Sequence, residues 1–120
     1  MKVLIVDDED LIRNIIKDYC INEGYSTYEA SDGIEAIDVF KKNADIDIIV
    51  LDIMMPNMNG VEVLKKLREE KVNVPVIALT ADAIEGQEEK YISEGFDGYL
   101  SKPIDKTKDE VILNKYLKGE

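Results

Sequence analysis

The sequence contains no histidine, and it contains a single cysteine, Cys20. Without histidine, the chain cannot contain a Ser-His-Asp triad or a zinc site built on histidine ligands, and it cannot supply its own phosphohistidine as a phosphoryl donor. A single cysteine excludes an internal disulfide bond and is typical of a reducing compartment. Because Cys20 shares a helical stripe with Ile12 and Ile16, we expect it in the core.

Long hydrophobic runs are also absent. No stretch approaches the ~20 apolar residues of a membrane-spanning helix. The apolar run Lys2–Val6 is followed at once by acidic residues and is too short for a signal peptide. We therefore expect a cytoplasmic protein without membrane insertion. A G-x-x-x-x-G-K loop is missing too, so a nucleotide is not the expected ligand.

Positive charge is scarce, with 15 basic residues against 26 acidic ones and a formal net charge of -11. A direct complex with DNA or RNA would have to overcome repulsion from the phosphates, so nucleic acid is not an expected partner. The 120 residues match one domain, and 45% hydrophobic residues suffice for one core. We expect a single domain over residues 1–120, with no output domain.

Strand and helix patterns alternate five times along the chain. Short apolar segments rich in β-branched residues predict strands, and apolar residues at helical spacing predict helices. The predicted strands are Lys2–Val6, Tyr25–Ala30, Ile46–Leu51, Val74–Leu79 and Tyr99–Ser101. The predicted helices contain residues 11–19, 34–40, 61–67, 84–94 and 106–117. This alternation indicates an α/β fold, with a mostly parallel sheet between two layers of helices.

Polar residues stand at the carboxyl ends of four predicted strands. Asp7 and Asp8 follow the first strand, and Asp52 follows the third. Thr80 follows the fourth strand, and Lys102 stands at the end of the fifth. Ligands of open α/β sheets bind beyond the carboxyl ends of the strands, where the strand order reverses. In the order 2-1-3-4-5, this point lies between the first and third strands and would gather the three carboxylates there.

Three carboxylates in one cleft repel each other, and raised pKa values or a bound cation must compensate. Oxygen ligands favour Mg²⁺, with Mn²⁺ or Ca²⁺ able to substitute, over zinc. The charge of Lys102 and the hydroxyl of Thr80 suit a phosphoryl group. Phosphoryl transfer depends mainly on positioning and charge stabilisation, and a carboxylate can be its nucleophile.

Four segments, each at a predicted strand end, carry a family resemblance: Val3–Asp8, Leu51–Gly60, Ala78–Ala81 and Gly98–Pro103. Together and in this order, they resemble the receiver domains of response regulators in two-component and phosphorelay signalling. The resemblance covers essentially the whole chain. It implies a flavodoxin-like, doubly wound (βα)5 fold with a five-stranded parallel sheet in the order 2-1-3-4-5.

The resemblance also implies the roles of the acidic residues. Asp52 would be the phosphoacceptor. Asp7, Asp8, Asp52 and the backbone carbonyl of Met54 would bind Mg²⁺. The side chains of Met54 and Asp82 stand where the family controls the access of water to the aspartyl phosphate. We expect Met54 to shield the acyl phosphate and Asp82 to repel or only weakly position water, so that both set the rate of dephosphorylation.

Residues near the last two strands would respond to the phosphoryl group. By the same resemblance, Lys102 would pair with it, and Thr80 would hydrogen-bond one of its oxygens. Tyr99 would turn inward as Thr80 moves. The Lys102–Pro103 peptide bond would be cis, which is the one kind of bond where that form costs little.

The function implied is a phosphoacceptor switch rather than an enzyme with an external substrate. A partner histidine kinase or histidine phosphotransfer protein would donate the phosphoryl group. The surface formed by the fourth helix, fifth strand and fifth helix would then change its binding of a downstream protein. The chain would catalyse only its own phosphorylation and slow dephosphorylation.

Two other functions share these features. A metal-dependent phosphohydrolase with an aspartate nucleophile would use the same chemistry, but it needs a substrate cap, and the D-x-D arrangement of one such class is absent at Asp52. A phosphorylation-independent interaction module would share the fold, but degenerate receivers usually lose an acid, the lysine or the threonine, and this chain keeps all of them. The start at Met1 favours a free-standing regulator, whereas segments 78–83 and 99–104 resemble receivers joined to hybrid kinases.

Overall fold

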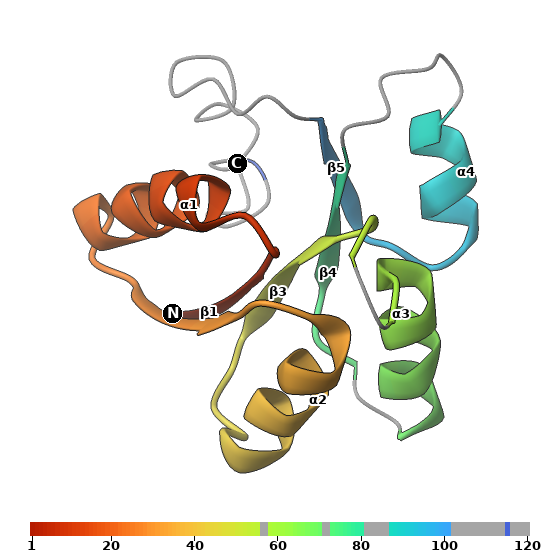
Figure 1. The fold of residues 1–120 in the computed structure, drawn as a ribbon, viewed down its shortest axis with the longest axis horizontal. Coiled ribbons are helices and arrows are strands. Elements are labelled where there is room, and N and C mark those ends of the chain that lie inside the picture. The colour runs from red at the N-terminus through yellow and green to blue at the C-terminus, as the bar shows by residue number, and fades with distance from the viewer. Residues whose placement is uncertain (56–57, 71–72, 81–86, 102–114, 116–120) are drawn as a thin grey trace.

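The computed structural model describes residues 1–55, 58–70, 73–80, 87–101 and 115 (Figure 1). The strands are β1 (Lys2–Val6), β2 (Ser26–Ala30), β3 (Ile48–Asp52), β4 (Val76–Thr80) and β5 (Gly98–Ser101). The helices are α1 (Asp10–Asn22), α2 (Gly33–Lys42), α3 (Gly60–Glu69) and α4 (Gln87–Ser93). The alternation predicted from the sequence is therefore confirmed over these residues. Most of the predicted helix at 106–117 lies outside them.

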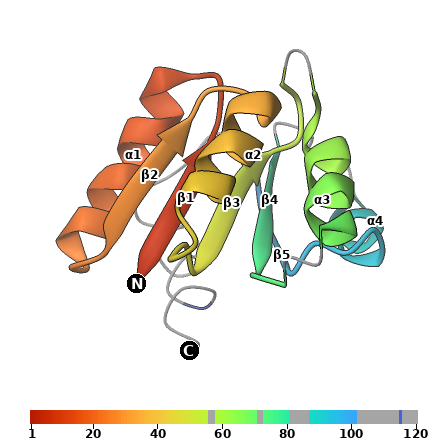
Figure 2. The same ribbon diagram turned by 90° about the horizontal axis from the view of Figure 1, so that it is seen from below.

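The five strands form one parallel sheet in the order β2-β1-β3-β4-β5 (Figure 2). This confirms the doubly wound, flavodoxin-like fold. The chain runs outward from β1 to β2, then crosses to β3 on the other side of β1 and continues outward. The strand order thus reverses between β1 and β3. Because every strand is parallel, all the carboxyl ends lie along one edge of the sheet.

Helices cover both faces of the sheet, with α1 on one side and α2 and α3 on the other (Figure 1). Successive strand residues point to opposite faces, so alternate positions of each strand supply different cores. The core beneath α1 contains Val3, Ile5, Ile12, Ile16, Tyr19, Cys20, Ile48, Val50, Ile77, Leu79 and Leu100. The opposite core includes Leu4, Val6, Ile37, Ile49, Leu51, Val63, Leu64, Leu67, Val76, Ala78, Tyr91 and Phe96. Every residue of β3 and β4 is buried, as their nearly continuous apolar sequences predict.

Two central strands begin and end later than the sequence pattern predicts. β3 begins at Ile48 and β4 at Val76, each two residues after the predicted start. At β4 the reason is Pro75, which has no N–H for the ladder, although its carbonyl accepts a hydrogen bond from Ile49 at 3.0 Å. The shift makes Asp52 and Thr80 the last residues of their strands, so the backbone of the sheet holds both.

The helix α1 follows directly from its apolar spacing. Its buried residues, Ile12, Ile16, Tyr19 and Cys20, recur on one side and face the sheet. The helix ends at Asn22, and Gly24 follows with φ of 82°, a left-handed conformation that favours glycine. No helix within the described residues is both long and apolar enough to cross a membrane.

Cys20 provides a test of this packing. It is fully buried, and burial raises the pKa of its thiol from 9.0 to about 12. We predict that iodoacetamide alkylates the native protein at mildly alkaline pH on the order of a thousandfold more slowly than the denatured chain, because the thiolate is the reactive form. Intact mass at timed intervals measures both rates. Equal rates would place Cys20 at the surface.

The same pKa shift links stability to pH. Between pH 9 and 12, the unfolded chain releases the Cys20 proton while the folded chain keeps it. The contribution of this thiol to the free energy of unfolding therefore falls as the pH rises through that window. Cys20→Ala lacks this contribution, so its stability should decline less steeply than that of the wild type over the same range.

Candidate metal and phosphoryl site

Asp7 comes directly after β1, and its backbone and side chain are both held in place. Its N–H donates to the carbonyl of Ala30 at the end of β2, at 3.1 Å. Its Oδ1 accepts a hydrogen bond from the N–H of Glu9 at 2.8 Å. Its own carbonyl accepts from Nη1 of Arg13, in α1, at 2.6 Å. Asp7 is completely buried by these surroundings, whereas the next residue, Asp8, is exposed.

Asp52 is the last residue of β3 and is also buried, with 1% of its surface exposed. It lies opposite Leu79 of β4 in the ladder, which continues one residue further through a 2.9 Å bond from the N–H of Ile53 to the carbonyl of Leu79. The N–H of Met54 then donates to Oδ1 of Asp52 at 3.1 Å. The sheet fixes the backbone of Asp52, and the following loop helps to orient its carboxylate.

The register between β1 and β3 brings the acidic residues together. Val6 lies opposite Leu51, so Asp7 and Asp52 follow at the same level of the sheet. Asp7, Asp8 and Asp52 each present a carboxylate oxygen, and these three oxygens lie within 4.8 Å of one another. A set of oxygen donors this compact fits a hard divalent cation such as Mg²⁺. Because Asp8 is exposed, an ion bound there would remain accessible to water and to a further oxygen ligand.

Thr80 is the last residue of β4 and is fully buried. It follows Leu79, the ladder partner of Asp52, and lies opposite Ser101 of β5. The structure therefore places Thr80 on the strand next to Asp52, at the same edge of the sheet. Lys102, Asp82 and Pro103 lie outside the described residues, so the structure does not describe the predicted lysine, the second water-access position or the predicted cis bond.

Tyr99 lies in β5 and is half-buried. Its ring stacks on that of Tyr91 in α4, with centroids 6.1 Å apart and an interplanar angle of 19°. Tyr91 also meets Phe96 edge-on, with centroids 5.9 Å apart. These contacts connect β5 to α4 through aromatic side chains. A change in the position of Tyr99 would therefore alter the packing of α4.

Gly60 ends the Leu51–Gly60 segment of the family resemblance, but its structural role was not predicted from the sequence. It begins α3, and its N–H donates to the carbonyl of Ile53 at 2.9 Å. A Cβ atom at this position would lie 2.6 Å from the carbonyl oxygen of Asp52 and 2.9 Å from Cα of Ile53. Asn59 caps the helix in a reciprocal arrangement with Glu62. The sequence offered one indication of this close contact. Most residues are tolerated at the first position of a helix, so a glycine directly after the N-cap residue points to a lack of space for a side chain.

Comparisons with known proteins agree with this architecture. Residues 3–113 match the model of the response regulator receiver domain. The sensor histidine kinase RcsC of Salmonella typhimurium is 36% identical over 104 residues, which are 87% of this chain and 11% of RcsC. The transcriptional regulatory protein SrrA of Staphylococcus aureus is 41% identical over 112 residues, or 93% of this chain and 45% of SrrA. This chain therefore spans only a minor part of either protein.

The fold matches solved structures as well. A chain of the CheX-CheY-BeF3-Mg²⁺ complex from Borrelia burgdorferi superposes with a TM-score of 0.87 at 30% identity, over 98% of this chain and 89% of that one. The chain belongs to the response regulator receiver domain family. Receiver domains of this family act in two-component and phosphorelay signalling, where they accept phosphoryl groups. The receiver fold thus accounts for the gathering of carboxylates at one edge of the sheet.

The close approach of Gly60 to Asp52 generates a prediction. Gly60→Ala would push its methyl group against the carbonyl of Asp52, so we expect a loss of about 1–3 kcal/mol in stability together with weaker Mg²⁺ binding. Gly24→Ala is the control: nothing lies within 4 Å of its Cβ, and only its positive φ makes the change costly. Calorimetric titration with Mg²⁺ should separate the two variants, and unchanged affinity in Gly60→Ala would contradict the prediction.

Proposed function

We propose that this receiver domain accepts a phosphoryl group on Asp52 from the phosphohistidine of a partner histidine kinase or phosphotransfer protein. The observation that carries the proposal is the cluster of Asp7, Asp8 and Asp52, whose oxygens lie within 4.8 Å of one another at the reversal point of the strand order. Family membership supports it, since RcsC is a sensor histidine kinase and SrrA a transcriptional regulator.

The reaction that we propose is an in-line displacement. A carboxylate oxygen of Asp52 forms a bond to phosphorus, the phosphorus–nitrogen bond of the donor breaks, and the imidazole leaves. The hydrogen bond from the N–H of Met54 keeps the carboxylate of Asp52 in one orientation, which favours attack from a fixed direction. Asp7, Asp8, Asp52 and the carbonyl of Met54 would hold Mg²⁺, which supplies positive charge to the phosphoryl oxygens when bound.

The signal would leave the site along β4 and β5. We propose that Thr80 and Lys102 bind the phosphoryl group and that Tyr99 moves with Thr80. The stack of Tyr99 on Tyr91 supports this route, because a displaced Tyr99 would change the contact with α4. The surface of α4, β5 and the helix predicted within residues 106–117 would then bind a downstream protein differently. The Borrelia neighbour, a CheY in complex with CheX, BeF3 and Mg²⁺, is in keeping with such partner binding.

Phosphorylation with a small donor tests the assignment of Asp52. We expect that incubation with acetyl phosphate and Mg²⁺ adds the mass of one phosphoryl group to the wild type. Addition should fail when EDTA replaces Mg²⁺, and it should fail in Asp52→Ala. Intact-mass spectrometry measures all three samples. An unmodified wild type, or equal modification of Asp52→Ala, would refute the proposal.

Met54 provides a test of phosphoryl lifetime. Its side chain is 70% exposed, two residues after Asp52, and it offers water no good hydrogen bond. Together with Asp82 it would limit the access of water to the aspartyl phosphate, so we expect severalfold faster dephosphorylation in Met54→Asn. Ile21→Asn is a matched control, because Ile21 is an exposed apolar residue at the C-terminal end of α1, whereas Asp7 and Asp8 precede the N-terminal end. Equal or slower phosphate loss in Met54→Asn would count against a shielding role.

A further inference from the structure

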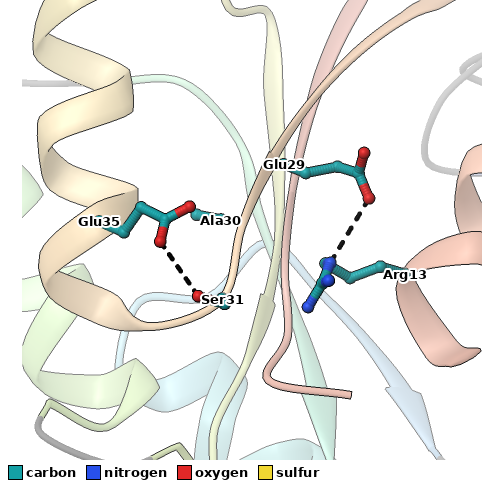
Figure 3. Close-up of a pocket in the computed structure, with 5 residues that line it drawn as sticks. All are labelled: Arg13, Glu29, Ala30, Ser31 and Glu35. Carbon is teal, nitrogen blue, oxygen red and sulfur yellow. Dashed lines mark hydrogen bonds and ion pairs between the residues drawn. The ribbon is translucent and has the colours of Figure 1, made fainter. Parts of the chain in front are cut away.

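Arg13 makes several contacts beside the acidic cluster, and the function proposed above assigns no role to this residue. It lies in the second turn of α1, and only 16% of its side chain is exposed. Its Nη1 donates to the carbonyl of Asp7 at 2.6 Å, and its Nε lies 3.4 Å from Oε1 of Glu29 in β2. Its Nη2 pairs with Asp10, which lies one turn earlier in α1. Figure 3 shows Arg13 and Glu29 pointing toward one another.

These contacts fix the peptide group between the two adjacent aspartates. The carbonyl of Asp7 and the N–H and Cα of Asp8 belong to one planar peptide unit. A hydrogen bond that holds the carbonyl oxygen therefore also fixes the position of the Asp8 backbone. On the other side, the N–H of Asp7 is held by Ala30 of β2. The residue is thus held at both of its backbone groups, and one of the two contacts comes from Arg13.

Arg13 is itself held firmly enough to act as a support. Glu29 anchors it to β2, and Asp10 anchors it to its own helix. A guanidinium group presents its donors in a rigid, planar arrangement, so two ion pairs leave little freedom for the group that bonds to Asp7. The contact therefore joins β1, β2 and α1 at the point where the acidic cluster begins.

We propose that Arg13 is a positioning residue of the cation site. It orients the Asp7–Asp8 peptide so that both carboxylates face Asp52 before a cation binds, and Glu29 holds Arg13 in place for this role. The inference rests on the proposed function, because it assumes that the cluster of Asp7, Asp8 and Asp52 binds Mg²⁺.

The charge of Arg13 makes the inference testable by the sign of an effect. A positive group beside the cluster repels a second cation, so if charge were its only contribution, removing it would tighten Mg²⁺ binding. If Arg13 positions the ligands, removing it weakens Mg²⁺ binding despite the lost repulsion. Mutation of a residue that holds a metal ligand in position typically weakens metal binding by about tenfold or more.

The surroundings of Arg13 favour variants that fold. A pocket of about 200 Å³ lies beside it, lined by Arg13, Glu29, Ala30, Ser31 and Glu35 (Figure 3). Ser31 donates to Glu35 across 3.0 Å, so the far wall of the pocket is tied together without Arg13. Water can enter this polar space when the side chain is shortened, so a collapse of the core is not expected.

The experiment compares Mg²⁺ dissociation constants by calorimetric titration at constant ionic strength, with urea unfolding in EDTA as a separate readout. We expect Arg13→Met to bind Mg²⁺ about tenfold more weakly, and Arg13→Lys to lie between this variant and the wild type. Lys17→Met is the matched control. Lys17 pairs with the same Glu29 at 3.3 Å, and within the described part of the chain this is its only ion pair. The Lys17→Met variant should bind Mg²⁺ as tightly as the wild type or slightly more tightly.

An Arg13→Met variant that binds Mg²⁺ as tightly as the wild type, or more tightly, overturns the inference. A merely structural role would lower the urea midpoint and leave the Mg²⁺ affinity of the folded protein unchanged. Should Arg13→Met fail to fold, Glu29→Asp shortens the anchor of Arg13 without changing the net charge. Weaker Mg²⁺ binding in Glu29→Asp than in the wild type supports the inference, and equal binding overturns it.

Failure of this inference is distinguishable from failure of the proposed function. A wild type that neither binds Mg²⁺ nor accepts a phosphoryl group overturns both. A wild type that does both, with unchanged Mg²⁺ binding in Arg13→Met, overturns the role of Arg13 alone and leaves the assignment of Asp52 standing.

Discussion

Carboxylate oxygens of Asp7, Asp8 and Asp52 lie within 4.8 Å of one another, and their mutual repulsion is the interaction that the surrounding structure has to withstand. Two unit charges this close repel by about 3 kcal/mol or more at an effective dielectric constant of about 20. Two of the three residues are buried, so water screens them poorly. A rigid framework holds the cluster together, and a bound cation would relieve its repulsion.

The framework is the parallel sheet. Its strands end at one edge, and the reversal of order between β1 and β3 places Asp7 beside Asp52 with the level set by the ladder. Apolar residues on both faces bury the central strands, which makes sliding of one strand past another costly. Asp7 and Asp52 therefore sit at the ends of largely buried central strands, while the exposed Asp8 and Met54 face the solvent from which a phosphoryl donor would approach.

The strands and the positions of Asp7, Asp8 and Asp52 at strand ends could be predicted, because apolar runs and strand-end residues are local features of the sequence. The sheet order came from the resemblance to receiver domains, because no local pattern specifies which strands pair. The start of β4 could not be placed as well, since the apolar pattern runs through Pro75 and only the missing N–H stops the ladder there. Arg13 and Gly60 were missed for another reason. The importance of Arg13 depends on its contact with Glu29, and that of Gly60 on its contact with Asp52. Both contacts form only when segments that are distant in the sequence come together in the fold.

The claim that the fold holds a repulsive cluster for a cation is tested most directly by the free energy of unfolding of the wild type and Asp52→Asn, each in EDTA and in saturating Mg²⁺. The account predicts that Asp52→Asn is the more stable protein in EDTA by about 1–3 kcal/mol. It predicts that Mg²⁺ closes or reverses this difference, because the wild type gains about 2.7 kcal/mol at a hundred times its dissociation constant. A wild type that is more stable than Asp52→Asn in EDTA, or that gains nothing from Mg²⁺, would contradict it.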